Sequence, residues 1–273
     1  MGFVTRFAPS PTGHLHLGHA LSAWAVAGQA RALGARMLLR LEDIDPTRCR
    51  RAYALSIAED LAWLGLTYDG PVVSQSARLS LYGEAIARLR ALGLIYPCSC
   101  TRRQVAAAAR AQGPDGPLYA GTCRDRGPVP GRPLAWRLNM AAALERVTGM
   151  TRDPRPWGDL VLVRRETPTS YHLAVVVDDA AQGISHVVRG KDLEAITAVH
   201  ELLQRLLDLP RPAYLFHDLI CHGDGRKYSK SERAPALRDL RAQGLRPEDL
   251  RLRLYGIPNL RRQIDPVEAG DFL

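Results

Sequence analysis

The opening of the chain constrains the fold most, because a strand, a glycine-containing turn, a helix and a second strand follow one another. Val4–Ala8 has the composition of a short strand and runs into Pro9–Gly13, a turn with two prolines and a glycine. His19–Leu33 is rich in alanine and leucine, and Gly34 follows it as a helix-ending residue. Ala35–Leu41 is typical of a buried strand. This strand–helix–strand unit predicts an α/β fold with a parallel sheet.

Further helical and strand patterns follow along the chain. Helices are predicted at Ser56–Leu64, Ser80–Leu92, Gln104–Ala111, Asp192–Leu207 and, as short pieces, over Pro235–Leu273. Strands returning to the main sheet are predicted at Val161–Val163, Leu173–Val177, His186–Val188 and Leu215–Ile220. The length of 273 residues suits one large domain, or one domain with a small insertion.

Composition and charge limit location and partners. With 46% hydrophobic and 24% charged residues, no run of eighteen apolar residues and no signal-peptide pattern, a cytoplasmic protein without membrane spans is expected. The net charge of +9 favours an anionic partner such as a nucleic acid. A coding bias toward arginine explains the charge equally well, so charge alone does not choose between the two.

Three of the five cysteines form a cluster in the sequence. Cys98, Cys100 and Cys123 lie in the stretch Pro97–Pro133, which is rich in glycine, proline and arginine and has little apolar periodicity. Without an export signal, such a cluster indicates a metal site rather than disulfides. A tetrahedral ion needs a fourth ligand, for which Tyr119, a histidine or water are candidates. Three unmetallated thiols are the alternative.

Two short segments near opposite ends of the chain have residues suited to phosphate. His16 and His19 flank Gly18 at the predicted start of a helix, where backbone N–H groups and the helix dipole favour anions. Lys227 and Lys230 follow a Gly-Asp-Gly turn. Each segment alone is more simply explained, the histidines as surface or capping residues and the lysines as an exposed basic loop.

Taken in order, the two segments resemble a known family. Ala8–His19 resembles the HIGH region of class I aminoacyl-tRNA synthetases, and Lys227-Tyr228-Ser229-Lys230-Ser231 resembles their KMSKS loop with Tyr in place of Met. The segments that narrow the resemblance to the glutamyl and glutaminyl branch are Arg6–Gly13, Arg40–Asp45, Tyr171–Asp179 and Val188–Gly190. Together these matches span about 225 residues in the family's order.

The resemblance implies a Rossmann-type catalytic domain that forms an aminoacyl-adenylate from ATP with Mg²⁺. It assigns catalysis to His16, His19 and Lys230, and ATP binding to His16, Gly18, His19, Lys227 and Lys230. By position, the glutamate pocket would consist of Arg6, Phe7, Ala8, Pro9, Ser10, Glu42, Tyr171 and Arg189. Arginine forks suit carboxylates, Glu42 suits the α-ammonium group, and Tyr171 can donate a hydrogen bond. Without the motifs, each charged residue of this set is more simply explained as one member of a surface ion pair.

The resemblance is greatest to the short glutamyl-queuosine branch of the family. There a C-x-C, Y-x-x-x-C arrangement binds zinc, which implies one structural Zn²⁺ on Cys98, Cys100, Tyr119 and Cys123. That branch has no anticodon-binding domain, activates L-glutamate without tRNA and esterifies it to queuosine in the anticodon stem-loop of tRNA-Asp; a monomer is expected. The alternatives are a tRNA-charging enzyme with a separate anticodon-reading partner, and a non-catalytic RNA-binding paralogue.

The expected organisation has four parts. Residues 1–96 form the first half of the catalytic domain and residues 97–133 the inserted zinc-binding module. Residues 134–232 form the second half, which ends in the KMSKS-like loop, and residues 233–273 form a short helical C-terminal segment.

Overall fold

The computed structural model describes residues 2–220, 235–257 and 259–266. Cys221 and the predicted phosphate segment Lys227–Ser231 lie outside these ranges. The chain divides into two compact units: the first comprises Met1–Ala77, Gly183–Glu194 and Pro212–Leu273, and the second comprises Arg78–Gln182 and Ala195–Arg211. The four-part organisation expected from the sequence stays a prediction.

The first unit contains the predicted parallel sheet. Strand β1 (Val4–Phe7) pairs in parallel with β2 (Arg36–Leu41), which pairs in parallel with β3 (Val73–Ser74). Strand β9 (His186–Gly190) pairs in parallel with β10 (Ala213–His217). The backbone N–H just before β9 donates to the carbonyl of Val4 at 2.9 Å, so β9 lies beside β1. The α/β fold predicted from the first forty or so residues is confirmed.

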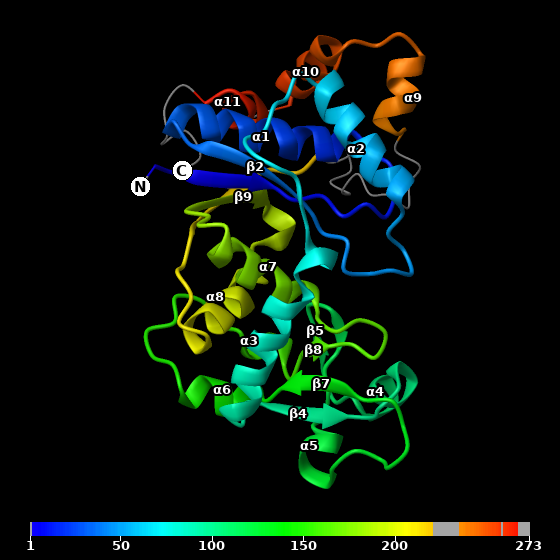
Figure 1. The fold of residues 1–273 in the computed structure, drawn as a ribbon, viewed down its shortest axis with the longest axis vertical. Helices are drawn as coiled ribbons and strands as arrows, with labels where there is room; N and C mark the ends of the chain where they lie inside the picture. The colour runs from blue at the N-terminus through cyan, green and yellow to red at the C-terminus, as the bar shows by residue number, and fades with distance from the viewer. Residues whose placement is uncertain (1, 221–234, 258, 267–273) are drawn as a thin grey trace. The chain divides into compact units, whose positions relative to one another are not determined.

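Helix α1 (Leu17–Leu33) is the centre of the first unit's core. Its residues from Ala20 to Ala30 are buried except Ser22, because α1 lies between the sheet and α11 (Leu260–Ile264), as Figure 1 shows. A helix that is apolar all round is stable only in such a covered position. Gly34 ends the helix in the left-handed conformation at φ 60°, a conformation glycine adopts without a steric penalty.

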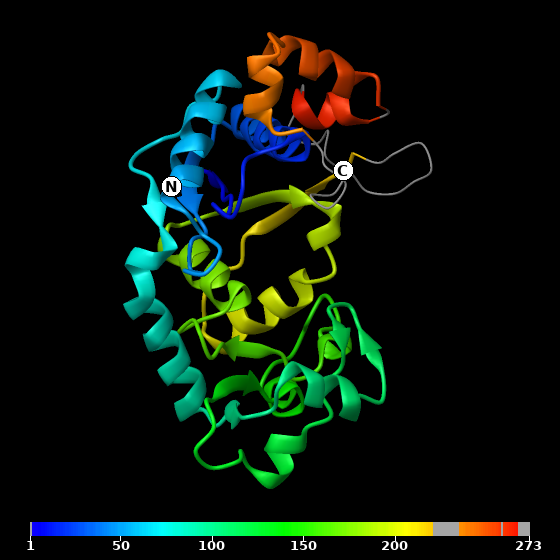
Figure 2. The same cartoon turned by 90° about the vertical axis from the view of Figure 1, so that its right-hand side faces the viewer.

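The described part of the first unit contains four more α-helices. They are α2 (Arg51–Trp63), α9 (Leu237–Ala242), α10 (Pro247–Tyr255) and α11. Figure 2 shows α9, α10 and α11, coloured orange to red, gathered next to α1 in blue. A Cβ on Gly28 would lie 2.2 Å from the carbonyl oxygen of Ile264, so only glycine lets α11 approach α1 this closely. The short helices predicted for the C-terminal segment are confirmed in its described part.

The second unit is built on an antiparallel sheet with helices around it. Its strands β4 (Ile95–Cys98), β7 (Ala135–Leu138) and β8 (Val161–Val163) pair in that order. The hairpin β5 (Gln112–Gly113) and β6 (Gly116–Pro117) is separate. Its helices are α3 (Leu79–Ala91), α4 (Arg102–Ala108), α5 (Thr122–Arg126), α6 (Met140–Glu145), α7 (Tyr171–Ala181) and α8 (Thr197–Leu206). Across both units, the described residues also form 3-10 turns at Gln75–Arg78, Arg155–Trp157 and Lys191–Leu193.

One strand prediction is wrong, and a second is right about the strand but wrong about its sheet. Leu173–Val177 belongs to helix α7, which begins after Ser170, whose hydroxyl accepts the N–H of Leu173 at 3.5 Å. All residues from Leu173 to Asp179 are buried, and a short, wholly apolar run has the same appearance in a buried helix as in a buried strand. Val161–Val163 is a strand, but it joins the antiparallel sheet of the second unit rather than the parallel one.

Several predicted boundaries also differ. The helix predicted from Asp192 begins at Thr197, because a 3-10 turn at Lys191–Leu193 comes first. Helix α4 begins at Arg102, where Thr101 and Gln104 form a reciprocal capping box, and it ends at Ala108 rather than Ala111. Throughout residues 2–220, 235–257 and 259–266, each helix is too short or too polar to cross a bilayer.

Candidate active site and metal centre

The start of α1 holds the two histidines predicted to bind phosphate. His16 is the N-cap residue, and its Nδ1 accepts the backbone N–H of Gly18 at 3.1 Å. The backbone N–H of His16 donates to Nδ1 of His19 at 3.1 Å, and the two ring centroids are 3.9 Å apart. A Cβ on Gly18 would lie 3.0 Å from Cε1 of His16, so glycine allows this ring to fold over the helix start.

These hydrogen bonds decide which ring nitrogen carries the proton. Since Nδ1 of His16 and of His19 each accepts a backbone N–H, the hydrogen of each neutral ring is on Nε2. Two Nε2–H donors therefore stand at a helix N-terminus, where the helix dipole favours an anion. The capping explanation and the phosphate-binding explanation are compatible, because capping uses Nδ1 and phosphate binding would use Nε2–H.

The chain returns to this point after more than two hundred residues. Ala236 forms an antiparallel bridge with His16, and the N–H of Leu237 donates to the carbonyl of Leu15 at 2.8 Å. Lys227 and Lys230 precede this bridge in the sequence but lie outside the described residues, so their proposed part in ATP binding stays a prediction.

Most residues of the predicted glutamate pocket lie near the carboxyl ends of neighbouring parallel strands. Arg6 is on β1 and is 5% exposed, and Glu42 directly follows β2, where its N–H donates to the carbonyl of Pro9 at 3.1 Å. Nη2 of Arg40 lies 3.5 Å from Oε1 of Glu42. Phe7 ends β1 and is buried, and the segment Ala8–Ser10 continues from it. In open parallel sheets, ligands bind at this edge.

Arg189 and Tyr171 complete the predicted pocket. Arg189 is on β9 and is buried, with its guanidinium carbon 4.8 Å from the centroid of the Tyr214 ring and 5.7 Å from that of Phe216. These two rings on β10 hold the cationic side chain of Arg189 on β9, which is the strand next to β1. Tyr171 begins helix α7 in the second unit, so its place in a glutamate pocket stays a prediction.

The structure brings the three clustered cysteines together. The sulfur atoms of Cys98, Cys100 and Cys123 all lie within 4.8 Å of one another, with 3.4 Å between Cys100 and Cys123. Cys98 ends β4 and Cys123 lies in the first turn of α5, and both are buried. The hydroxyl oxygen of Tyr119 is 3.4 Å from the sulfur of Cys98 and 3.5 Å from that of Cys100.

These distances fit a tetrahedral ion. With zinc–sulfur bonds of about 2.3 Å, ligand sulfurs lie about 3.8 Å apart, and an oxygen ligand lies about 3.5 Å from each sulfur. Burial raises the pKa of the Cys123 thiol, but hydrogen bonds from the Tyr119 hydroxyl and the Ser99 backbone outweigh burial and lower the pKa to about 6. Cys123 is thus readily a thiolate, the form that binds a metal. Three thiols and a phenol oxygen at these distances form a candidate metal centre.

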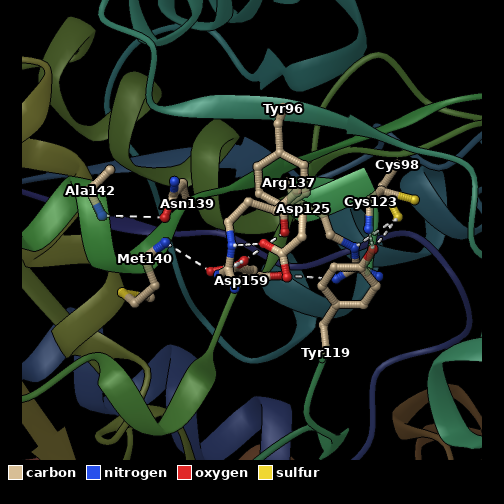
Figure 3. Close-up of polar contacts among 11 residues, drawn as sticks. Tyr96, Cys98, Tyr119, Cys123, Asp125, Arg137, Asn139, Met140, Ala142 and Asp159 are labelled. Carbon is tan, nitrogen blue, oxygen red and sulfur yellow. Dashed lines mark hydrogen bonds and ion pairs between the residues drawn. The ribbon is translucent and has the colours of Figure 1, made fainter. Parts of the chain in front are cut away.

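Two residues beside the cysteines had no signal in the sequence. Arg137 on β7 donates from Nε to the sulfur of Cys98 at 3.3 Å and from Nη1 to the carbonyl of Asp159 at 2.7 Å (Figure 3). The carboxylate of Asp159 is buried and accepts from the Tyr96 hydroxyl at 2.6 Å. One arginine among 37 lysines and arginines is not conspicuous, so only the fold could single out Arg137.

Comparison with known proteins identifies the family of the chain. The model of a family described as "tRNA synthetases class I (E and Q), catalytic domain" matches residues 3–127 and 144–261. The chain belongs to this family. As a class I tRNA synthetase catalytic domain of the E and Q group, it has the expected α/β fold, and ATP binding is expected of that fold.

The similar proteins bear closely related names. The chain is 48% identical to the Glutamyl-Q tRNA(Asp) synthetase of Rhodobacter capsulatus over 93% of this chain and 100% of that protein. It is 42% identical to the protein of the same name from Neisseria meningitidis serogroup B, over 99% and 94%. The glutamate-tRNA synthetase structure from Elizabethkingia anophelis superposes with a TM-score of 0.77 at 22% identity, covering 100% of this chain and 67% of that one, which shows a shared fold.

Proposed function

We propose that this class I synthetase activates L-glutamate with ATP and transfers it to the queuosine base in the anticodon loop of tRNA-Asp. The main support for this function is the similarity of the chain, at 48% and 42% identity over nearly whole chains, to two proteins named Glutamyl-Q tRNA(Asp) synthetase. The helix start at His16 and the strand-end position of Arg6 support the activation step independently of those names.

In the first step, a carboxylate oxygen of glutamate attacks the α-phosphorus of ATP, and the bond to pyrophosphate breaks to leave glutamyl-adenylate. Nε2–H of His16 and of His19 would donate to phosphate oxygens as negative charge develops there, which lowers the energy of the transition state. Gly18 leaves room for the His16 ring over the helix start, and Lys227 and Lys230 would contact the phosphates of ATP. Mg²⁺, bound with ATP, supplies neutralisation of the triphosphate charge.

Glutamate would be recognised at the carboxyl ends of β1, β2 and β9. Arg6 and Arg189 would each present a planar fork to a carboxylate, and Glu42 would accept a hydrogen bond from the α-ammonium group. The segment Phe7–Ser10 would line the pocket, and the phenol of Tyr171 would donate to the side-chain carboxylate. A cationic fork favours glutamate over glutamine, because an amide cannot match its charge.

In the second step, a hydroxyl oxygen of queuosine attacks the carbonyl carbon of glutamyl-adenylate. An ester forms, AMP leaves with the bonding electron pair, and the hydroxyl proton passes to solvent. The net charge of +9 suits contacts with the phosphates of the anticodon stem-loop, so RNA binding should weaken as salt rises.

The metal centre would hold one structural Zn²⁺ on Cys98, Cys100, Cys123 and Tyr119. The ion would join β4, α5 and the segment before α5 in a part of the second unit with few buried apolar side chains. Zinc content of the purified chain, measured by elemental analysis, tests this part of the proposal.

Transfer of labelled glutamate to tRNA-Asp with and without queuosine tests the function as a whole. We expect ATP–pyrophosphate exchange that depends on glutamate and needs no RNA, and labelling only of the queuosine-containing tRNA. Labelling of an unmodified tRNA at its 3′ end would contradict the choice of acceptor and favour the tRNA-charging alternative. Absence of ATP–pyrophosphate exchange would contradict the hypothesis that the chain is an enzyme and would favour a non-catalytic RNA-binding paralogue.

A further inference from the structure

We infer that Arg137 is a positioning residue of the candidate metal centre: it balances the charge of the thiolates and fixes Tyr119 as the fourth ligand. The inference rests on the proposed metal site and goes beyond its four ligands. Arg137 lies in residues 128–143, the interval that the family model leaves unmatched between its two matched segments.

Strand register places Arg137 next to the metal ligands. Strands β4 and β7 are antiparallel, and Tyr96 is opposite Arg137 while Cys98 is opposite Ala135. Tyr96 and Cys98 are two residues apart and so share a face of the sheet with Arg137, which reaches Cys98 diagonally. Nε of Arg137 donates to the Cys98 sulfur at 3.3 Å.

The same guanidinium lies over the ring of Tyr119. Its central carbon is 4.0 Å from the ring centroid, a close cation–π contact. The Tyr119 oxygen, 3.4 Å and 3.5 Å from two of the sulfurs, also accepts the backbone N–H of Cys123 at 2.7 Å. One planar group thus touches one sulfur ligand and the ring that carries the oxygen ligand, and it holds both in a fixed relation.

Charge explains why an arginine is suited to this position. Three thiolates around a divalent ion leave a net charge of about −1, which is costly to bury without a compensating cation. The guanidinium of Arg137 supplies that cation, and it stays charged at every pH the protein meets. Groups of this kind, which contact ligands rather than the ion, typically change metal affinity by about 10–100-fold when removed.

A buried carboxylate holds Arg137 in place. Asp159, whose side chain is 4% exposed, accepts from the Tyr96 hydroxyl at 2.6 Å, from Nη1 of Arg124 at 2.9 Å and from the N–H of Met140 at 2.9 Å. With its side chain anchored, its backbone carbonyl accepts Nη1 of Arg137 at 2.7 Å, as Figure 3 shows. The network leaves the guanidinium little freedom to leave Cys98 and Tyr119.

The rate of zinc transfer from the loaded full chain to a chromophoric chelator tests the inference. Arg137→Met removes the charge at similar length, and we expect zinc to leave about 10-fold faster or more. Arg137→Lys keeps the charge but loses the planar fork, so an intermediate rate is expected. Arg165→Met is the matched control, because Arg165 donates to the backbone carbonyl of Cys100 at 2.8 Å; its zinc should leave at nearly the wild-type rate.

A double-mutant cycle separates positioning from a general structural role. In a Tyr119→Phe background the oxygen ligand is gone, so the Arg137→Met effect should be several-fold smaller than in the wild type. If Arg137 merely supported the sheet, its fold-change would be the same in both backgrounds, and that result would overturn the inference. Arg137→Lys provides the same comparison should the methionine variant not fold.

The outcomes also separate this inference from the proposed function. A wild-type chain that takes up no zinc would overturn the metal site and Arg137's role together. Zinc bound but released at the wild-type rate by both Arg137 variants would overturn the role of Arg137 alone. Failure to glutamylate tRNA-Asp would overturn the proposed acceptor and leave the zinc measurements unaffected.

Discussion

The start of helix α1 and the cysteine cluster both gather reactive side chains, but they are built in different ways. At α1, neighbours on one helical turn hold each other: the backbone N–H of His16 donates to Nδ1 of His19, and that of Gly18 donates to Nδ1 of His16. At the cluster, ligands come from β4, from α5 and from Tyr119, and a cation on a further strand touches them. The first arrangement is local and needs no ion, whereas the second depends on tertiary contacts.

This difference has an energetic side. A helix cap contributes about 1 kcal/mol, and its geometry follows from the helix it begins. Three thiols held within 4.8 Å of one another repel once ionised, so the cluster is stable as thiolates only with a bound cation. Perturbing the helix start should therefore change chemistry with little loss of stability, and perturbing the cluster should change stability first.

The largest expected effect is on chemistry at the helix start. Asn is a good N-cap residue, so His16→Asn keeps the cap but removes the Nε2–H donor. Glutamate-dependent ATP–pyrophosphate exchange should fall about 100-fold or more, while the melting temperature changes little. His14→Asn is the matched control, because His14 contacts the Ser56 hydroxyl at 3.0 Å and is outside the capping pair. Equal exchange in both variants would show that His16 only caps.

The second effect reverses the pattern. Cys123→Ser removes one buried thiolate from the cluster, so bound zinc should fall well below one per chain. A loss of about 2–3 kcal/mol would lower the melting temperature by about 5–10 °C, which differential scanning calorimetry measures. Cys49→Ser, at a half-buried thiol outside the cluster, should change neither quantity. Unchanged zinc content in Cys123→Ser would refute the ligand set.

A third change tests whether the helix start is truly local. Gly28→Ala places a Cβ 2.2 Å from the Ile264 carbonyl oxygen, so α11 must shift, at a cost of about 2–3 kcal/mol in urea unfolding. The clash is twelve residues, or about 18 Å, along α1 from His16, so exchange by the folded fraction should hold. Gly83→Ala in α3, whose Cβ meets nothing within 4 Å, is the control. A parallel fall in exchange would show that α11 shapes the catalytic end.

The smallest effect concerns pH and a buried carboxyl of the first unit. Asp60 on α2 is 0% exposed, and neither of its oxygens has a hydrogen-bond partner within the described ranges. Burial raises the pKa of Asp60 from 3.8 to about 6, although Arg241 opposes the shift. The folded state thus binds this proton more tightly, so its stabilising contribution is complete below pH 3.8 and is lost as pH rises through about 6.

Asp60→Asn should remove that loss. The variant should be more stable than the wild type by about 1–2 kcal/mol at pH 7.5, with a smaller difference at pH 4.5, in urea titrations at both pH values. Because Asp60 belongs to the first unit, zinc binding by the cluster should be the same in both proteins. A difference in stability that does not vary with pH would mean that the pKa of the Asp60 carboxyl is the same in the folded and unfolded states.

The sequence anticipated much of the first unit and less of the second. The parallel strands β1 and β2 and the helix between them follow from apolar pattern, turn residues and Gly34, all of which act locally. The spacing of the three cysteines predicts a metal site, and the structure places their sulfur atoms together with the hydroxyl of Tyr119. Helix α7 was mistaken for a strand because the run Leu173–Val177 is apolar on every side, and only the packing around it decides its conformation.

What the sequence alone determined is local: the histidine pair three residues apart, the glycine-ended helices and the ordered motifs that mark the family. What the tertiary structure decided is which distant residues meet. Arg137 and Cys98 are 39 positions apart, and their contact exists because β4 and β7 pair in one register and Asp159 anchors the guanidinium. Short-range spacing encodes caps and turns, but strand register depends on the packing of the whole unit, so the partner of the metal ligands emerged only from the fold.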